Sequence, residues 1–134
     1  MKRRLRLMLA DDNPLVLDLV EQMLKKQFVI TGTCRDGASV LREVSTLEPD
    51  VVILDISMGQ TNGFEVARQL KEMDCPTKVV FLTVHEDIEF VRAAVGVGAV
   101  GYVCKSSINS DLIDAIHSVI VNKLFFPTLF AGRP

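Results

Sequence analysis

Five polar residues that could do chemistry together stand where apolar stretches of the sequence end. They are Asp11 and Asp12 after the first stretch, Asp55 after the third, Thr83 ending the fourth and Lys105 after the fifth. Carboxylates that meet without a counter-ion repel one another and raise each other's pKa, and a divalent cation such as Mg²⁺ would relieve them. An ammonium group and a hydroxyl beside a carboxylate would stabilise charge on phosphoryl oxygens. This set of residues therefore indicates Mg²⁺-assisted phosphoryl transfer.

Each of these residues also has an ordinary structural explanation. Asp12 could cap a helix, and Asp55 could be a turn residue that ends a strand. Thr83 could be a plain strand terminus, and Lys105 a solvated surface lysine. The functional interpretation is favoured because all of them end or follow predicted strands, and ligands of open α/β sheets bind outside the carboxyl ends of the strands.

The elements that must position these residues alternate along the chain. Apolar runs predict strands, and patterns of period 3.6 predict a helix after each one. Strict alternation of this kind implies βαβ crossovers and a parallel sheet covered on both faces. We expect an α/β fold with a doubly wound five-stranded parallel sheet of order 2-1-3-4-5, whose switch point lies between strands 1 and 3. The predicted strands cover residues 5–10, 28–33 (more polar, hence an edge strand), 51–55, 78–83 and 99–104.

The first helix is predicted to begin with Asn13 as its cap and Pro14 at its first position. Its predicted core-facing stripe consists of Leu15, Leu19 and Met23 with Val16 and Val20. The other helices are predicted over residues 37–46, 63–73, 87–95 and 109–122.

Composition limits the class of protein. A chain of 134 residues with 49% apolar and 24% charged residues is typical of one soluble globular domain and excludes disorder. A net charge of −2 lacks the basic excess of a nucleic-acid binder, and no apolar run approaches the roughly 20 residues of a membrane span. Cys34, Cys75 and Cys104 have no CxxC spacing, which favours reduced thiols in the cytoplasm.

Several strings of the sequence resemble one family. The sequence resembles the receiver domains of bacterial two-component response regulators over roughly residues 4–123. The resemblance is carried by the strings LMLADDNP, VVILDISMGQTNGFEVARQLK, VVFLTV and GAVGYVCKS. In the strings GAVGYVCKS and AIHSVIVNKLFFP the sequence resembles receivers of the LuxR/NarL-like subfamily. Such receivers usually precede a helix-turn-helix output domain. The resemblance implies a flavodoxin- and CheY-like (βα)5 receiver over residues 1–124. Residues 125–134 would be a C-terminal tail or the start of a linker, and we expect a domain boundary where the chain ends.

The resemblance also implies roles for single residues. Asp55 matches the aspartate that accepts a phosphoryl group from a histidine kinase or phosphotransfer protein. Asp11 and Asp12 match the acidic pair that holds Mg²⁺, together with Asp55 and the backbone carbonyl of Ser57. Lys105 matches the lysine that pairs with the phosphoryl group. Such a domain is not a classical enzyme, because it catalyses its own phosphorylation and slow dephosphorylation.

Two further residues match the family's conformational switch. Thr83 corresponds to the switch hydroxyl, and Tyr102 to the aromatic residue whose rotamer follows it. The resemblance implies that the face of helix 4, strand 5 and helix 5 then controls an output, which is transcription where a DNA-binding domain follows. A homodimer is possible, and we expect neither direct DNA binding by this domain nor contact with a membrane.

The sequence departs from the family's pattern at three positions. Gly59 stands where proline is usual and is expected to loosen its loop, and Ser106 also replaces a common proline. Val84 stands where a small residue is usual. His85 is expected near the mouth of the site, where it could orient water or tune decay of the phosphoryl group, whereas His117 is expected on a solvated face.

Three other classes of protein remain as alternatives. A pseudo-receiver that only binds partners is disfavoured because all the reacting residues are present. An aspartyl-phosphate phosphatase needs a second acid two residues after its nucleophile, where this sequence has Ser57. A nucleotide-binding module needs a GxGxxG or Walker A run after strand 1, and the sequence has none there.

Val84 generates a kinetic prediction. A stiff, β-branched side chain beside the phospho-accepting carboxylate would narrow the in-line path to phosphorus, and a misplacement of about 1 Å can cost on the order of 10²-fold. Val84→Ala should therefore speed both phosphorylation by small donors and loss of the phosphoryl group, as followed by intact mass. If Val84 only packs against the following helix, the substitution will cost a little stability and leave both rates unchanged.

Overall fold

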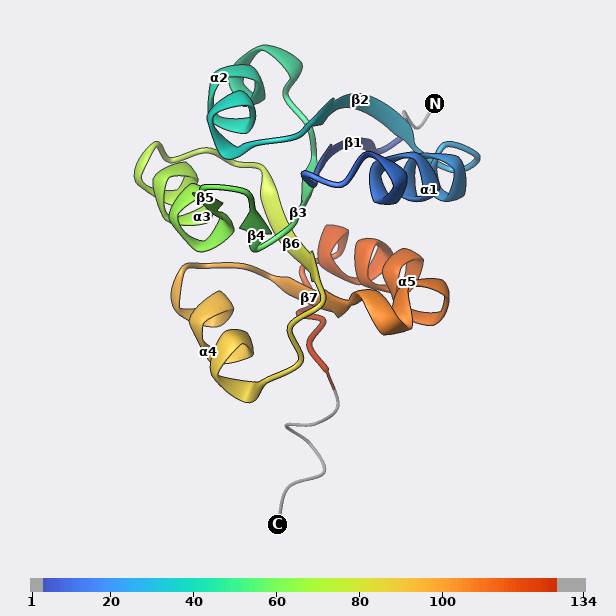
Figure 1. The fold of residues 1–134 in the computed structure, drawn as a ribbon. Coiled ribbons are helices and arrows are strands. Elements are labelled where there is room, and N and C mark those ends of the chain that lie inside the picture. Colours follow the sequence, from blue (N-terminus) through green and yellow to red (C-terminus); the bar gives the residue numbers. More distant parts are fainter. Residues whose placement is uncertain (1–3, 128–134) are drawn as a thin grey trace.

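The computed structural model describes residues 4–127 and contains one central parallel sheet (Figure 1). Its strand order is β2-β1-β3-β6-β7, which confirms the doubly wound order 2-1-3-4-5 once the two-residue strands β4 and β5 are set aside. The more polar strand β2 lies at the edge, as predicted. The sheet strands are β1 (Arg6–Ala10), β2 (Val29–Cys34), β3 (Val51–Leu54), β6 (Lys78–Thr83) and β7 (Gly101–Cys104).

Four α-helices connect these strands, and a fifth follows the last strand. They are α1 (Pro14–Leu24), α2 (Gly37–Leu47), α3 (Gly63–Glu72), α4 (Ile88–Gly96) and α5 (Ile108–Ile120), and α5 is preceded by a 3₁₀ turn, η1 (Lys105–Ser107). The antiparallel pair β4 (Ser57–Met58) and β5 (Thr61–Asn62) stands between β3 and α3 and was not predicted. Of the predicted tail, residues 128–134 lie outside the described residues, and so does the boundary expected at the end of the chain.

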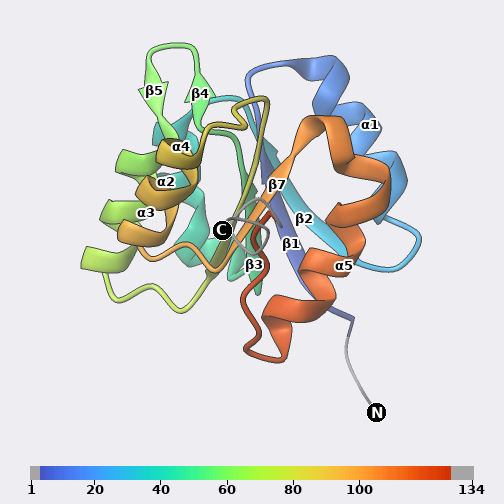
Figure 2. The ribbon, with the colours of Figure 1, turned by 90° about the horizontal axis from the view of Figure 1, so that it is seen from below.

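The helices cover the sheet in two layers. Helices α1 and α5 lie on one face, whereas α2, α3 and α4 lie on the other (Figure 2). Strand β3 serves both layers because successive side chains of a strand point to opposite faces. Val51 and Ile53 join the cluster under α1 and α5, and Val52 and Leu54 join the cluster under the other three helices. The most central strand is therefore apolar throughout, and Asp55 is the first polar residue after it.

Helix α1 begins as predicted but buries a different face. The side-chain carbonyl of Asn13 accepts a hydrogen bond from the amide of Leu15 at 2.9 Å. The residues that α1 buries are Leu17, Val20 and Leu24, whereas Leu15 is 80% and Leu19 is 56% exposed. The predicted stripe was therefore wrong at Leu15 and Leu19. Apolar residues fill most of the first two turns of α1, so the sequence contains two overlapping apolar stripes. Only the side on which the sheet packs against α1 decides which stripe is buried.

Gly63 brings the start of α3 directly against the backbone that follows β3. Its amide donates a hydrogen bond to the carbonyl of Ile56 at 2.6 Å. A Cβ at this position would stand 2.2 Å from the carbonyl oxygen of Asp55 and 2.9 Å from the Cα of Ile56. Only glycine allows this approach, which holds the backbone around Asp55 in place.

Gly63→Ala should therefore lower the free energy of unfolding by about 1–3 kcal/mol, because backbone cannot rotate away as a side chain can. The matched control is Gly96→Ala in α4, where a Cβ meets nothing within 4 Å, so stability should be unchanged or slightly higher. Urea denaturation of both variants measures the difference, and equal stabilities would contradict the close approach.

Candidate functional site

The structure brings three carboxylates together at the carboxyl ends of β1 and β3. These strands pair directly, with Ala10 opposite Leu54, so that Asp11 and Asp55 emerge side by side. One oxygen each of Asp11, Asp12 and Asp55 lies within 4.8 Å of the others. Asp11 is only 4% and Asp55 only 5% exposed. Two negative charges are therefore held almost out of water at the switch point of the sheet.

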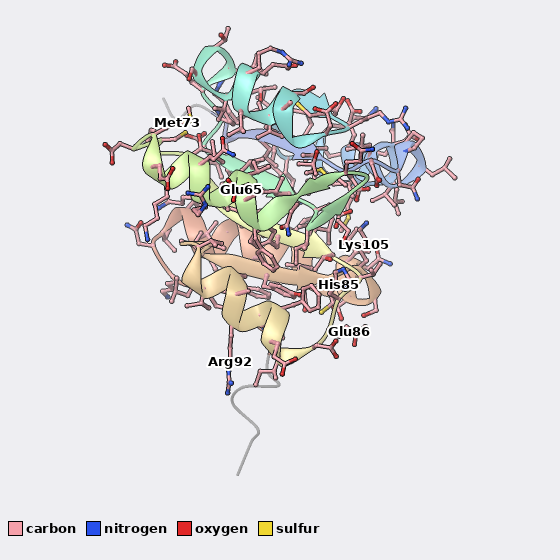
Figure 3. All side chains as sticks on the ribbon, turned by 60° about the vertical axis from the view of Figure 1, so that its left-hand side comes forward. Glu65, Met73, His85, Glu86, Arg92 and Lys105 are labelled. Carbon is pink, nitrogen blue, oxygen red and sulfur yellow. The ribbon has the colours of Figure 1, made fainter. Side chains whose placement is uncertain are left out.

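Lys105 supplies positive charge to this cluster from the end of β7, the edge strand of the sheet. It is the first residue of η1, directly after β7, and lies at the same end of the molecule as His85 (Figure 3). Its Nζ is 2.7 Å from Oδ2 of Asp11 and 3.3 Å from Oδ2 of Asp55. One ammonium group thus bridges the ends of two different strands.

The pKa directions follow from this arrangement. Burial raises the pKa of Asp55, and the charge of Asp11 raises it further, whereas Lys105 acts in the opposite direction and offsets only part of the rise. Burial acts to lower the pKa of Lys105, but its hydrogen bond to Asp11 and the charges of both carboxylates raise it overall. Lys105 therefore stays charged, and the cluster keeps an excess of negative charge.

The cluster fits a hard divalent cation on its own chemistry. Three carboxylates offer oxygen atoms within a few ångströms of one another, and the raised pKa of Asp55 shows that its charge is undercompensated. Mg²⁺ prefers a few carboxylates, with water and phosphate oxygens completing its shell. The residues present are therefore suited to holding Mg²⁺ beside Asp55.

Thr83 and Tyr102 are both connected to the backbone of His85. Thr83 ends β6 and is fully buried, and its Oγ1 accepts a hydrogen bond from the amide of His85 at 3.3 Å. Tyr102, in β7, donates its hydroxyl to the carbonyl of His85 at 2.8 Å. Burial raises the pKa of Tyr102, so this hydroxyl keeps the proton that it donates. The loop after β6 therefore joins the two predicted switch residues.

The side chain of His85 adds contacts that the sequence did not indicate. Its Nε2 lies 3.0 Å from Oγ of Ser57, and its ring stacks on Phe90 at 4.1 Å between centroids. Ser57 begins β4, two residues after Asp55, so the ring joins the loops that follow β3 and β6. No periodicity marks this pair, because its members are 28 residues apart in the chain.

Gly59 has a defined conformation in the turn between β4 and β5. Its φ is +60°, a region that proline cannot reach and that glycine adopts without strain. The loop here is an antiparallel pair in which Met58 opposes Thr61. Glycine at this position therefore permits a specific turn, and the looser loop expected from glycine stays a prediction.

The other residues singled out from the sequence lie as follows. Val84 is 65% exposed, and its effect on rates stays a prediction. Ser106 donates its hydroxyl to Glu86 at 3.1 Å. His117 is exposed on α5, as predicted, with its ring 5.6 Å from that of Phe28. The three cysteines are free thiols.

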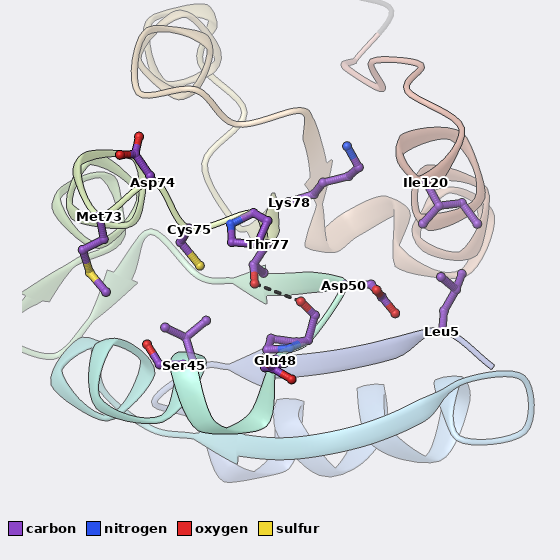
Figure 4. Close-up of a pocket in the computed structure, with 13 residues that line it drawn as sticks. Leu5, Ser45, Glu48, Asp50, Met73, Asp74, Cys75, Thr77, Lys78 and Ile120 are labelled. Atoms are coloured by element: carbon purple, nitrogen blue, oxygen red, sulfur yellow. Dashed lines mark hydrogen bonds between the residues drawn. The ribbon is translucent and has the colours of Figure 1, made fainter. Parts of the chain in front are cut away.

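A cavity of about 630 Å³ lies at the end of the sheet opposite the three carboxylates (Figure 4). Its lining includes Leu5, Pro49 and Lys78, which stand at or before the amino ends of β1, β3 and β6. Thr77 closes one side with a hydrogen bond to the carbonyl of Pro49 at 2.9 Å. This cavity contains neither the three carboxylates nor Lys105, so it is separate from the site described above.

Comparison with known proteins agrees with the fold and the site. Residues 7–117 match the model of the response regulator receiver domain, and the chain therefore belongs to this family of two-component signalling modules. It is 31% identical over 134 residues to the transcriptional regulatory protein YxjL of Bacillus subtilis, covering 98% of this chain and 62% of that protein. It is also 33% identical over 115 residues to the positive alginate biosynthesis regulatory protein of Pseudomonas aeruginosa, covering 84% of this chain and 46% of that protein. The chain thus spans less than two thirds of these relatives.

Solved structures place it among receivers of the LuxR/NarL type. A LuxR-family response regulator from Aurantimonas superposes with a TM-score of 0.90 at 25% identity, over 96% of this chain and 94% of that one. The receiver domain of a NarL response regulator from Mycobacterium tuberculosis superposes with a TM-score of 0.84 at 27% identity, over 91% and 100% of the two chains.

Within residues 4–127, none of the helices has the length and apolar character needed to cross a membrane.

The raised pKa of Asp55 predicts that its charge costs stability. Asp55→Asn removes that charge at nearly constant shape and should raise the free energy of unfolding at pH 7 by about 1 kcal/mol, a usual size for one substitution. The pKa of Asp55 is higher in the folded than in the unfolded state. The gain in the free energy of unfolding should therefore be full at pH values above the folded pKa and vanish as pH falls toward about 3.9.

The measurement is denaturant unfolding of the wild type and the Asn variant at several pH values, with Asp18→Asn on the exposed face of α1 as the control. A less stable Asn variant at pH 7, or a gain that persists below pH 4, would contradict this account.

Proposed function

We propose that this domain is a phosphorylation-dependent switch in which Asp55 accepts a phosphoryl group from a phosphohistidine. The observation that carries the proposal is a buried carboxylate with raised pKa, 3.3 Å from the ammonium of Lys105 and beside two further carboxylates. The donor would be a histidine kinase or a phosphotransfer protein. Since the relatives are transcriptional regulators and extend beyond this domain, the output would be transcription through a DNA-binding domain in the whole protein.

The residues of this chain would share the transfer as follows. An oxygen of Asp55 attacks phosphorus, the P–N bond breaks, and its electron pair goes to the departing imidazole while the new P–O bond forms. Lys105, already close to Asp55, would pair with a phosphoryl oxygen as charge builds on the equatorial oxygens. Mg²⁺, held by Asp11, Asp12, Asp55 and the carbonyl of Ser57, would supply the remaining neutralising charge.

Conformational output would begin at Thr83. Its Oγ1 accepts from the amide of His85 and keeps its own proton, which it could donate to a phosphoryl oxygen. A shift of Thr83 would move His85, and with it the carbonyl that Tyr102 uses. The signal would then reach the face formed by α4, β7 and α5, where it could bias a partner or a homodimer. The domain itself would not bind DNA and would act in the cytoplasm.

Two alternatives are less well supported. A pseudo-receiver would lack one of the reacting groups, whereas Asp55, Lys105 and Thr83 all stand at neighbouring strand ends here. A phosphatase would need an acid at position 57, and the hydroxyl of Ser57 is instead paired with His85.

Incubation with a small phosphodonor and Mg²⁺ should add one phosphoryl group to the wild type and none to Asp55→Asn. Asp12→Ala should reduce the rate to below about a hundredth of the wild-type value, the usual cost of removing one preorganised electrostatic group. Intact mass follows the reaction, and Asp18→Ala, which removes an exposed carboxylate, is the matched control. Modification at a residue other than Asp55, or an undiminished rate in Asp12→Ala, would refute the assignment.

A further inference from the structure

Arg35 lies directly after β2, at the same end of the sheet as the three carboxylates. Its Nη2 donates a hydrogen bond to the backbone carbonyl of Asp12 at 3.1 Å, although the two residues are 23 positions apart in the chain. The loop from β1 to α1 and the hairpin of β4 and β5 lie at this end of the molecule (Figure 2). Because β2 and β7 are the two edges of the sheet, Arg35 approaches the site from the edge opposite Lys105.

The three carboxylates of the site are not held equally. Asp11 and Asp55 share the ammonium of Lys105, at 2.7 Å and 3.3 Å. In the described part of the chain, the carboxylate of Asp12 has no ion pair or hydrogen bond of its own. Asp12 is therefore positioned through its backbone, and the carbonyl of that backbone is bonded to Arg35.

The backbone around Arg35 is held by hydrogen bonds on either side. The carbonyl of Cys34 accepts the amide of Asp11 at 3.0 Å, which extends the pairing of β1 and β2 up to the residue before Arg35. The side chain of Asp36 caps α2 by accepting the amide of Ser39 at 2.8 Å. The guanidinium group thus extends toward Asp12 from a backbone that is already in place.

We propose that Arg35 is a positioning residue for the divalent cation. By holding the carbonyl of Asp12, it keeps the carboxylate of Asp12 beside those of Asp11 and Asp55, where one oxygen of each lies within 4.8 Å of the others. The inference rests on the Mg²⁺ site of the proposed function. Arg35 acts on the cation only through Asp12, and no role in the phosphoryl transfer itself is assigned to it.

The charge and the hydrogen bond of Arg35 act on the cation in opposite directions. A guanidinium group near a cation site repels the cation, so loss of the charge alone should tighten Mg²⁺ binding. Loss of the hydrogen bond should weaken Mg²⁺ binding, because the groups that orient metal ligands contribute to metal affinity. Arg35 is exposed, and salt screens the charge of an exposed side chain. The hydrogen bond should therefore outweigh the repulsion.

The experiment titrates Mg²⁺ alone into the whole 134-residue chain at constant ionic strength and follows amide shifts by NMR. Arg35→Ala should weaken Mg²⁺ binding at least about threefold, within the range expected for one hydrogen bond. Arg35→Met, which keeps the bulk of the side chain without its charge or donors, should have the same effect. Arg42→Ala is the matched control, because Arg42 is an exposed arginine whose hydrogen bond goes to Ser39 of its own helix.

A second pair of variants tests whether Arg35 acts through Asp12. An Asp12→Ala chain has no carboxylate at this position to orient. Adding Arg35→Ala to that chain should therefore change the Mg²⁺ affinity by less than about twofold, the usual deviation between independent sites.

The outcomes separate the site from the role of Arg35. If Asp12→Ala binds Mg²⁺ as tightly as the wild type, the Mg²⁺ site of the proposed function and the role of Arg35 are overturned together. If binding depends on Asp12 but Arg35→Ala binds as tightly as Arg42→Ala, or more tightly, the role of Arg35 alone is overturned. An equal loss from Arg35→Ala with and without the carboxylate of Asp12 also overturns that role alone.

Discussion

The ion pairs of Lys105 with Asp11 and Asp55 are the interaction on which the site depends. Two carboxylates at adjacent strand ends are almost completely buried, and their repulsion is tolerated because one ammonium lies within 2.7 Å of the first and 3.3 Å of the second. The compensation is partial, since the pKa of Asp55 remains raised. A site with leftover negative charge suits a divalent ion, and under the proposed function its fixed cation would pair with the phosphoryl group.

Holding these charges in place requires the whole sheet. Asp11 follows β1, Asp55 follows β3 and Lys105 follows β7, so the triad exists only when strands from both ends of the chain are in register. Gly63 adds a local constraint, because the start of α3 approaches the backbone of Asp55 more closely than any Cβ would allow. The charges thus stand directly after three strands, where the pairing of the sheet fixes their positions.

The loop after β6 connects the two predicted switch residues with the loop after β3. His85 holds Thr83 and Tyr102 through its backbone and Ser57 through its ring, and the amide of Tyr102 is bonded to the chain after α5. Hydrogen bonds therefore connect Ser57 and Thr83, which lie near the carboxylates, with the backbone of Phe125. The bonds of His85 to Thr83 and Tyr102 are half-buried and costly to leave unpaired, whereas its contact with Ser57 is exposed.

The sequence by itself determined the order of the elements and the positions of Asp11, Asp12, Asp55, Thr83 and Lys105 at strand ends. Those features are local, since a buried parallel strand must be apolar throughout and its first polar residue marks its end. The tertiary structure alone decided which stripe of α1 is buried, that Ser57 meets His85, and that Phe125 bridges to Gly101. Each of these joins surfaces or residues distant along the chain. Periodicity carries no information about such pairs, because a stripe or a tail becomes buried only through the partner that the fold brings to it.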